Sequence, residues 1–299
     1  MNTIVIGVDA SERAEDAIAF GRLLTDATAA QFVVASAFGS TEYAPMRDVA
    51  LDTAGALKER LGTPRAHVRV LADPSPAQAL QRLAHSERAA LLVVGSSHVG
   101  RYGRVWPGST AERLLHGAPC AVAVVPSGYR DRAQTPLRRV GVAYDGSASA
   151  QAALAAGAAI AHATGAGLEI IGVVESEGYV APALIGIPAV AVAREDLERH
   201  VQDQLDAALD GLAGGIDATA VRLAGDPAER LGEHSGRLDV LICGSRGRGP
   251  LRSVLLGGVS GRLVRTARCP LIVVPNGVED PLGGLFGAVR PRSASSASR

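Results

Sequence analysis

Short apolar runs alternate along the chain with longer segments of mixed polarity that have the length of helices. Most runs are continuously apolar, which is typical of strands buried on both faces of a sheet. Helix-length connections between such strands favour right-handed crossovers and a parallel sheet. The pattern predicts an α/β fold with two doubly wound, Rossmann-like sheets of five parallel strands. The predicted strands are 3–8, 31–37, 66–71, 90–95, 121–125, 139–144, 168–174, 217–223, 239–243 and 271–275.

The chain contains an internal repeat. Residues 3–11 resemble residues 139–147, at a spacing of 136, and residues 120–126 resemble residues 269–275, at a spacing of 149. Constant spacing over two long segments indicates a duplication.

The repeat predicts one domain at 1–127 and a second at 138–277. The polar, arginine-rich stretch 127–139 between them is predicted to be a linker. Residues 278–299 are rich in Gly, Ser and Arg. Such a composition buries too little apolar surface to offset the entropy of ordering, so it predicts a disordered tail.

The second copy is longer than the first, and its extra residues fall near 176–195. This stretch follows the predicted second strand, on the side of the sheet where ligands bind in such folds. It is apolar and contains Pro182 and Pro188. One interpretation is a lid over the second site or a patch for a partner. The other is a loop packed on the second helix.

A glycine-containing pattern follows the fourth strand of each copy. Glycines let the backbone approach an anion, and the free N–H groups of a following helix start point at it. The pattern therefore predicts a phosphate cradle, although a tight strand-to-helix loop would also explain the glycines. Copy one has Gly95-Ser96-Ser97-His98, nine residues, then Gly108-Ser109-Thr110-Ala111, and copy two has Gly244-Ser245-Arg246-Gly247, nine residues, then Gly257-Gly258-Val259-Ser260.

This G-x-x-G, nine residues, then G-S/T pattern resembles the ATP-binding signature of the universal stress protein family. The run 269–275 resembles the last strand of that family, and the resemblance covers both copies. It implies an adenine-nucleotide alpha-hydrolase-like fold in tandem, with ATP as the ligand, with or without Mg²⁺. The chain departs from the signature at His98, Ala111 and Gly258.

An aspartate ends the first strand of each copy, Asp9 in the first and Asp145 in the second. A carboxylate there can accept hydrogen bonds from a ribose hydroxyl or a base. The resemblance assigns it to adenosine, with Ala37 and Val173 lining the adenine pocket. The alternative is that each aspartate caps the first helix, where Ser11 and Ser147 also offer caps. The predicted binding residues are Asp9, Ala37, Gly95, His98, Gly108, Ser109, Thr110, Asp145, Val173, Gly244, Gly247, Gly257, Gly258, Val259 and Ser260.

Composition narrows the classes of function. The formal net charge is zero, and nothing in the composition suggests a basic face for nucleic acid. Lys58 is the only lysine, so a Walker-type site is excluded. Cys120, Cys243 and Cys269 lack metal or redox spacing and are expected to be buried free thiols. Without a signal peptide or an apolar run of membrane-spanning length, a cytoplasmic protein is expected.

No metal-binding or catalytic constellation stands out. The sequence therefore favours an ATP-binding regulatory, stress-response protein, which is not expected to be an enzyme beyond weak ATP hydrolysis. A weak ATPase and a dimerisation scaffold with degenerate nucleotide sites are the alternatives. The last strand of each copy is expected at a sheet edge, and the resemblance implies that these two strands meet in an internal pseudo-dimer. A further homodimer is possible on the same grounds.

Overall fold

The structure is a computed structural model that describes residues 3–39, 44–96, 105, 108–132, 136–175, 188–212, 214–245, 257–277 and 281–287. Its strands agree with the predicted ones to within one residue at each end. They are β1 (Thr3–Val8), β2 (Gln31–Phe38), β3 (Ala66–Ala72), β4 (Ala89–Gly95), β5 (Ala121–Val125), β6 (Arg139–Ala143), β7 (Gly167–Val174), β8 (Ala218–Ala224), β9 (Val240–Gly244) and β10 (Leu271–Val274).

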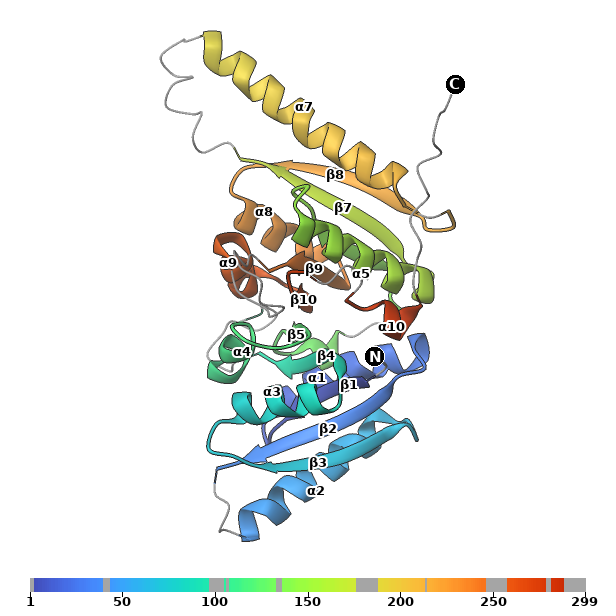
Figure 1. The fold of residues 1–299 in the computed structure, drawn as a ribbon, viewed down its shortest axis with the longest axis vertical. Helices are drawn as coiled ribbons and strands as arrows, with labels where there is room; N and C mark the ends of the chain where they lie inside the picture. The colour runs from blue at the N-terminus through green and yellow to red at the C-terminus, as the bar shows by residue number, and fades with distance from the viewer. Residues whose placement is uncertain are drawn as a thin grey trace.

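The two repeats share one ten-stranded sheet, with the order β3-β2-β1-β4-β5-β10-β9-β6-β7-β8. Within each repeat the strands are parallel, as predicted. At the centre β5 and β10 pair antiparallel, with Ile272 opposite Ala123. Figure 1 shows the first repeat below and the second above this junction. The last strands of the two copies thus meet as the resemblance implied, and neither is left as an edge.

Helices cover both faces of the sheet. The helices of the first repeat are α1 (Glu12–Ala27), α2 (Ala44–Leu61), α3 (Pro76–Ser86) and α4 (Ser109–Leu114), followed by the 3₁₀ turn η1 (Tyr129–Asp131). Those of the second are α5 (Ala148–Thr164), α7 (Pro188–Asp210), α8 (Pro227–His234), the 3₁₀ turn η2 (Ser235–Arg237), α9 (Gly258–Thr266) and α10 (Gly283–Phe286).

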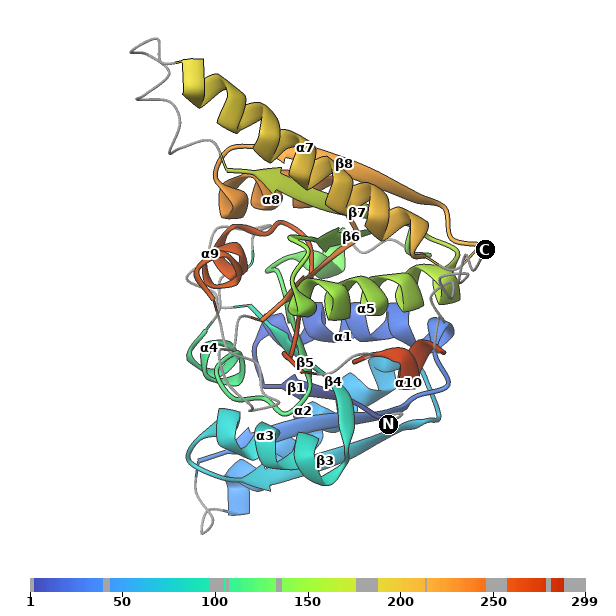
Figure 2. The same ribbon diagram turned by 45° about the horizontal axis from the view of Figure 1, so that its top comes forward.

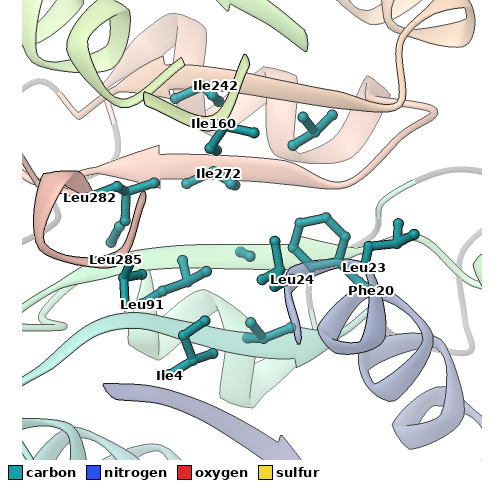
Figure 3. Close-up of a cluster of buried hydrophobic side chains, with 14 of the residues drawn as sticks. Ile4, Phe20, Leu23, Leu24, Leu91, Ile160, Ile242, Ile272, Leu282 and Leu285 are labelled. Carbon is teal, nitrogen blue, oxygen red and sulfur yellow. The ribbon is translucent and has the colours of Figure 1, made fainter. Parts of the chain in front are cut away.

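The strands send alternate side chains into two apolar layers. Ile4 and Ile6 of β1 pack in the layer that contains α1, α2, α5 and α7, whereas Val5 packs in the layer that contains α3, α4, α8 and α9. Each layer contains residues of both repeats. Figure 3 shows the layer that contains α1 and α5, around the β5–β10 junction. The two repeats therefore share their core as well as their sheet.

Helix starts differ in detail from the predicted caps. Ser147 caps α5 by accepting a hydrogen bond from the Ala150 N–H at 3.2 Å, as expected. Ser11 occupies the same position before α1 but makes no side-chain cap. Its hydroxyl instead donates to Asp9 and accepts from the Arg13 Nε at 3.0 Å, because Arg13 is close enough to compete for it.

The third helices also begin differently. In the second repeat Asp226 caps α8, accepting a hydrogen bond from the Glu229 N–H at 2.9 Å, and Pro227 is its first residue. The matching helix α3 begins two residues later than its Asp-Pro pair, at Pro76. Asp73 therefore forms the preceding turn, in which it accepts a hydrogen bond from the Ser75 N–H at 2.6 Å.

The first part of the predicted linker packs on the first domain. Asp16 of α1 is only 1% exposed and accepts hydrogen bonds from the Gly128 and Arg130 N–H groups, both at 2.9 Å. Tyr129 is buried and meets Phe20 edge-to-face, with ring centroids 6.0 Å apart. These contacts anchor η1 to α1.

Part of the predicted disordered tail is ordered, and the expectation of disorder is wrong for residues 281–287. This segment contains α10, which packs on α5. Leu282, Leu285 and Phe286 are buried in the shared core, and Figure 3 shows the two leucines near Ile272. The prediction counted the Gly and Ser content of the whole tail and missed this short apolar group. Residues 288–299 lie outside the described part of the chain.

The described part of the insertion is helical from Pro188 onward, within α7. The predicted lid falls largely on residues 176–187, which the structure does not describe. In the described residues, no helix is long and apolar enough to cross a membrane.

Candidate functional site

Each repeat has a cavity beyond the carboxyl ends of its parallel strands. In each repeat the second and third strands are added on one side of the first strand, and the fourth and fifth on its other side. The strand order therefore reverses between the first and fourth strands, and ligands bind at such a point. The cavity of the first repeat measures about 400 Å³. It is lined by Gly7, Val8, Asp9, Arg13, Ala14, Ala35, Ala37, Pro76, Leu80, Val94, Gly95, Ser96, Gly108, Ser109, Thr110 and Ala111.

The cavity of the second repeat occupies the same place and measures about 290 Å³. It is lined by Ala143, Tyr144, Asp145, Ser149, Ala150, Ile171, Val173, Glu175, Leu197, His200, Val201, Gln204, Pro227, Leu231, Cys243, Gly244, Val259, Ser260 and Leu263. Both volumes lie near the lower end of the range for small-molecule sites, about 300 to 1,000 Å³.

Most of the predicted site residues line these cavities. In the first repeat they are Asp9, Ala37, Gly95, Gly108, Ser109 and Thr110. In the second they are Asp145, Val173, Gly244, Val259 and Ser260. Gly257 and Gly258 are next to this lining but are not part of it. His98 and Gly247 lie outside the described residues.

The two aspartates make the same local turn. The Asp9 carboxylate accepts a hydrogen bond from the Ser11 N–H at 3.0 Å, and Asp145 accepts one from the Ser147 N–H at 3.1 Å. Both side chains are exposed at the cavity. Each carboxylate thus forms the turn before the first helix, whereas Ser11 and Ser147 occupy the cap position itself, and each still faces the space where a ligand would bind.

The glycine at the end of the fourth strand has a steric role that is independent of any ligand. A Cβ at Gly95 would lie 2.5 Å from the Arg13 carbonyl oxygen. A Cβ at Gly244 would lie 2.6 Å from the Ser149 carbonyl oxygen. Since these atoms belong to the backbone, any other residue would force the backbone to shift, and glycine is favoured at either position.

The second glycine cluster opens the fourth helix in each repeat, as predicted. Gly108 precedes α4 and Gly257 precedes α9, both in extended conformation. The Ser260 hydroxyl accepts a hydrogen bond from the Gly257 N–H at 2.8 Å. Ala111 stands at the corresponding position of the first repeat and provides no such bond, so the two helix starts are held differently.

Sequence reasoning missed several residues that line the cavities. Arg13 contributes to the first, where it pairs with Asp9 at 3.5 Å, and Ser149 occupies its position in the second. Tyr144 contributes to the second, and burial and the Asp145 charge raise the pKa of its phenol. Side chains of α7 also line the second cavity. Arg13 sits four residues after Asp9 on a helix start, a spacing that could have signalled it.

The cysteines are free and buried, as predicted. Desolvation raises the pKa of the Cys243 thiol to about 12, although this residue lines the second cavity. A thiol with such a pKa is a poor nucleophile at neutral pH. Within the described ranges, no group of three or more His, Cys, Asp or Glu side chains is placed to hold a metal ion.

The fold and the paired cavities define a tandem α/β protein with one candidate ligand site per repeat. The model of the universal stress protein family matches residues 1–126 and 136–275. The chain belongs to the universal stress protein family.

Curated relatives carry the same family name. Universal stress protein Rv2005c of Mycobacterium tuberculosis H37Rv is 32% identical over 191 residues, and this match spans 63% of the chain and 62% of the relative. Universal stress protein MT2698 of Mycobacterium tuberculosis CDC 1551 is 26% identical over 227 residues, which span 76% of the chain and 74% of the relative.

Solved structures share the tandem fold. A universal stress protein from Archaeoglobus fulgidus superposes with a TM-score of 0.66 at 19% identity and covers 92% of the chain and 99% of its own. A functionally unknown protein, PA1789, from Pseudomonas aeruginosa superposes with a TM-score of 0.64 at 14% identity, covering 92% and 93%. At these identities the likeness concerns the fold alone.

Proposed function

We propose that the chain is an adenine-nucleotide-binding regulatory protein of the stress response, with one ATP site in each repeat. Binding shifts the population of conformations or assemblies through its different affinity for each. The protein acts through this shift rather than through turnover.

One observation carries the proposal. Most of the residues that the repeated pattern selected, far apart in each copy, border one cavity in each repeat, at the strand ends where the order reverses. In the second repeat, the proposed phosphate end lies at Gly244 and the start of α9, which presents the N–H groups of its first turn and its positive dipole end. Asp145 and Val173 then lie on the side of the ribose and base.

Mg²⁺ would enter this site with the triphosphate. The described carboxylates at the second cavity are Asp145 and Glu175, too few for a closed magnesium cage. Mg²⁺ commonly keeps several waters and binds through substrate phosphates with one or two carboxylates. The residues present fit that mode.

An equilibrium titration with ATP, with and without Mg²⁺, tests the proposal. We expect two equivalents of ATP per chain in the wild type. Asp9→Ala and Asp145→Ala should each weaken one of the two binding events, and mass spectrometry should find an adenine nucleotide that copurifies. Absence of ATP binding to a folded wild-type chain would refute the proposal.

A scaffold with degenerate sites is the second candidate, and the glycine contacts favour it. Gly95 and Gly244 are required by backbone packing even if no ligand binds. The shared sheet and core would serve a scaffold equally well. The same titration separates the two functions, and a phosphate-release assay with Mg²⁺-ATP tests for weak hydrolysis.

A further inference from the structure

The second cavity has a wall that no described residue forms in the first. Four side chains of α7 line it, namely Leu197, His200, Val201 and Gln204. In the first repeat, none of the described side chains of the matching helix α2 lines the cavity. Figures 1 and 2 show α7 running along β7 and β8 and extending beyond them toward the side of the strand ends.

The sheet order indicates which part of a nucleotide meets this wall. Neighbouring strands run β9-β6-β7, and the proposed phosphate end lies at β9 and α9. A nucleotide that extends away from α9 crosses the end of β6 at Asp145 and reaches β7 and α7. Its base would therefore lie among Ile171, Val173, Leu197 and Val201, where Gln204 supplies a side-chain amide.

The Gln204 amide occupies space that a glycine peculiar to the second repeat leaves open. A Cβ at Gly146 would lie 2.5 Å from the Gln204 Nε2, and the Gly146 φ of +74° disfavours other residues. The first repeat has Ala10 at this position, and its backbone does not adopt a positive φ. The turn after the second aspartate is thus shaped to admit the amide.

A second contact orients the amide. The Gln204 Nε2 donates a hydrogen bond to the His200 Nε2 at 3.1 Å. The remaining N–H and the carbonyl oxygen form one edge with a donor and an acceptor. Among the hydrogen bonds of the described residues, this carbonyl oxygen takes part in none. Such an edge matches adenine, whose N6 donor stands beside a ring-nitrogen acceptor. Guanine presents two acceptors at O6 and N7, and at O6 and N1–H it presents acceptor and donor in the reverse order, which the amide could match only by turning its N–H away from His200.

We propose that Gln204 selects adenine over guanine in the second site, with His200 as its positioning residue, a selection that no described residue supplies in the first site. The inference rests on the proposed function, because it concerns the ligand of the same site. It makes the two repeats unequal, with one base-selective site and one base-tolerant site.

Titrations of the full chain with ATP and with GTP test this inference, comparing the wild type with Gln204→Leu. We expect the variant to lose about tenfold in ATP affinity at one site, while its GTP affinity there changes much less. Photolabelling with azido-ATP and peptide mapping should assign the loss to the second repeat. His200→Ala should reduce the ATP preference by a smaller factor.

Gln202→Leu is the matched control, because Gln202 lies on the same helix, bonds Asp206 at 2.9 Å and does not line the cavity. It should bind both nucleotides like the wild type. ATP and GTP affinities of Gln204→Leu that both stay within about twofold of the wild type would overturn the inference and leave the proposed function standing. An equal loss for both nucleotides would also overturn it, since a general disturbance of the site explains that result. A wild-type chain that binds no ATP would overturn both.

Discussion

The two repeats share one backbone plan and differ around their candidate sites. Both have the same strand order, a glycine that packs on the backbone of the first helix, and an aspartate turn at the end of the first strand. The rims differ, with Arg13 in the first site and the α7 wall in the second. Close backbone packing thus keeps the buried residues of the two repeats alike, whereas the residues at the mouth of each cavity can differ.

The segments that close the two repeats also differ. After β5 the chain forms η1, which Asp16 and Tyr129 anchor to α1. After β10 the chain forms α10, which packs on α5, a helix whose buried face consists mostly of alanines. Ala152 replaces Asp16 at the matching position of α5. One closure is polar and the other apolar, so their variants should respond differently.

Among the substitutions considered, one in α10, the apolar segment that closes the second repeat, should lower stability the most. Leu282→Ala removes a fully buried side chain and should lower the free energy of unfolding by about 2 to 5 kcal/mol. Urea denaturation followed by circular dichroism measures this loss. Leu51→Ala, at a leucine that is 44% exposed, is the control and should change stability by less than about 0.5 kcal/mol. Equal stabilities of the two variants would contradict the packing of α10.

Substitution of the glycine that ends the fourth strand of each repeat should give the next largest loss of stability. Gly244→Ala forces a Cβ against the Ser149 backbone and should lower the unfolding free energy by about 1 to 3 kcal/mol. Gly258→Ala is the matched control, since no atom lies within 4 Å of its added Cβ, and it should be neutral or slightly stabilising in α9. Thermal melts of both variants measure the contrast, which a harmless Gly244→Ala would refute.

The polar closure predicts a pH-dependent effect. Asp16→Asn leaves one of two backbone N–H donors poorly paired and should lower the unfolding free energy by about 1 to 3 kcal/mol. Burial raises the pKa of the Asp16 carboxyl above its ordinary value of 3.8, despite the opposing effect of its hydrogen bonds. The folded state therefore holds this proton more tightly than the unfolded state does.

It follows that Asp16 contributes most to stability below pH 3.8, and that this contribution declines as the pH rises through the folded-state pKa. The stability advantage of the wild type over Asp16→Asn should shrink over that window. Urea denaturation of both proteins from acidic to neutral pH measures the difference. An advantage that grows with pH would show that the direction of the pKa shift is wrong.

The contact between the fourth helices should give the smallest effect. Glu112 of α4 and Arg265 of α9 form an ion pair across the β5–β10 junction at 3.0 Å, and both side chains are about half exposed. Glu112→Gln should cost less than about 1 kcal/mol, and added salt should reduce the cost further. Denaturation at low and high salt checks both statements. A larger, salt-independent loss would mean that this pair holds the two repeats together.

The sequence by itself determined the ten strands, the duplication and the places of Asp9, Asp145, Gly95 and Gly244. These features are local, because a continuous apolar run identifies a buried strand and a repeated motif appears at constant spacing. The pairing of β5 with β10 could be expected only from the family resemblance, because the residues of a strand do not indicate which other strand it pairs with.

Tertiary structure alone decided the features that depend on contacts between distant residues. The amide of Gln204 meets Gly146 across 58 positions of the chain, and Asp16 meets Gly128 across 112. α10 is buried against the alanine-rich face of α5, a contact that the residues of α10 do not by themselves indicate. Local patterns determine elements and their order, whereas the walls of a site depend on which side chains the completed fold brings together.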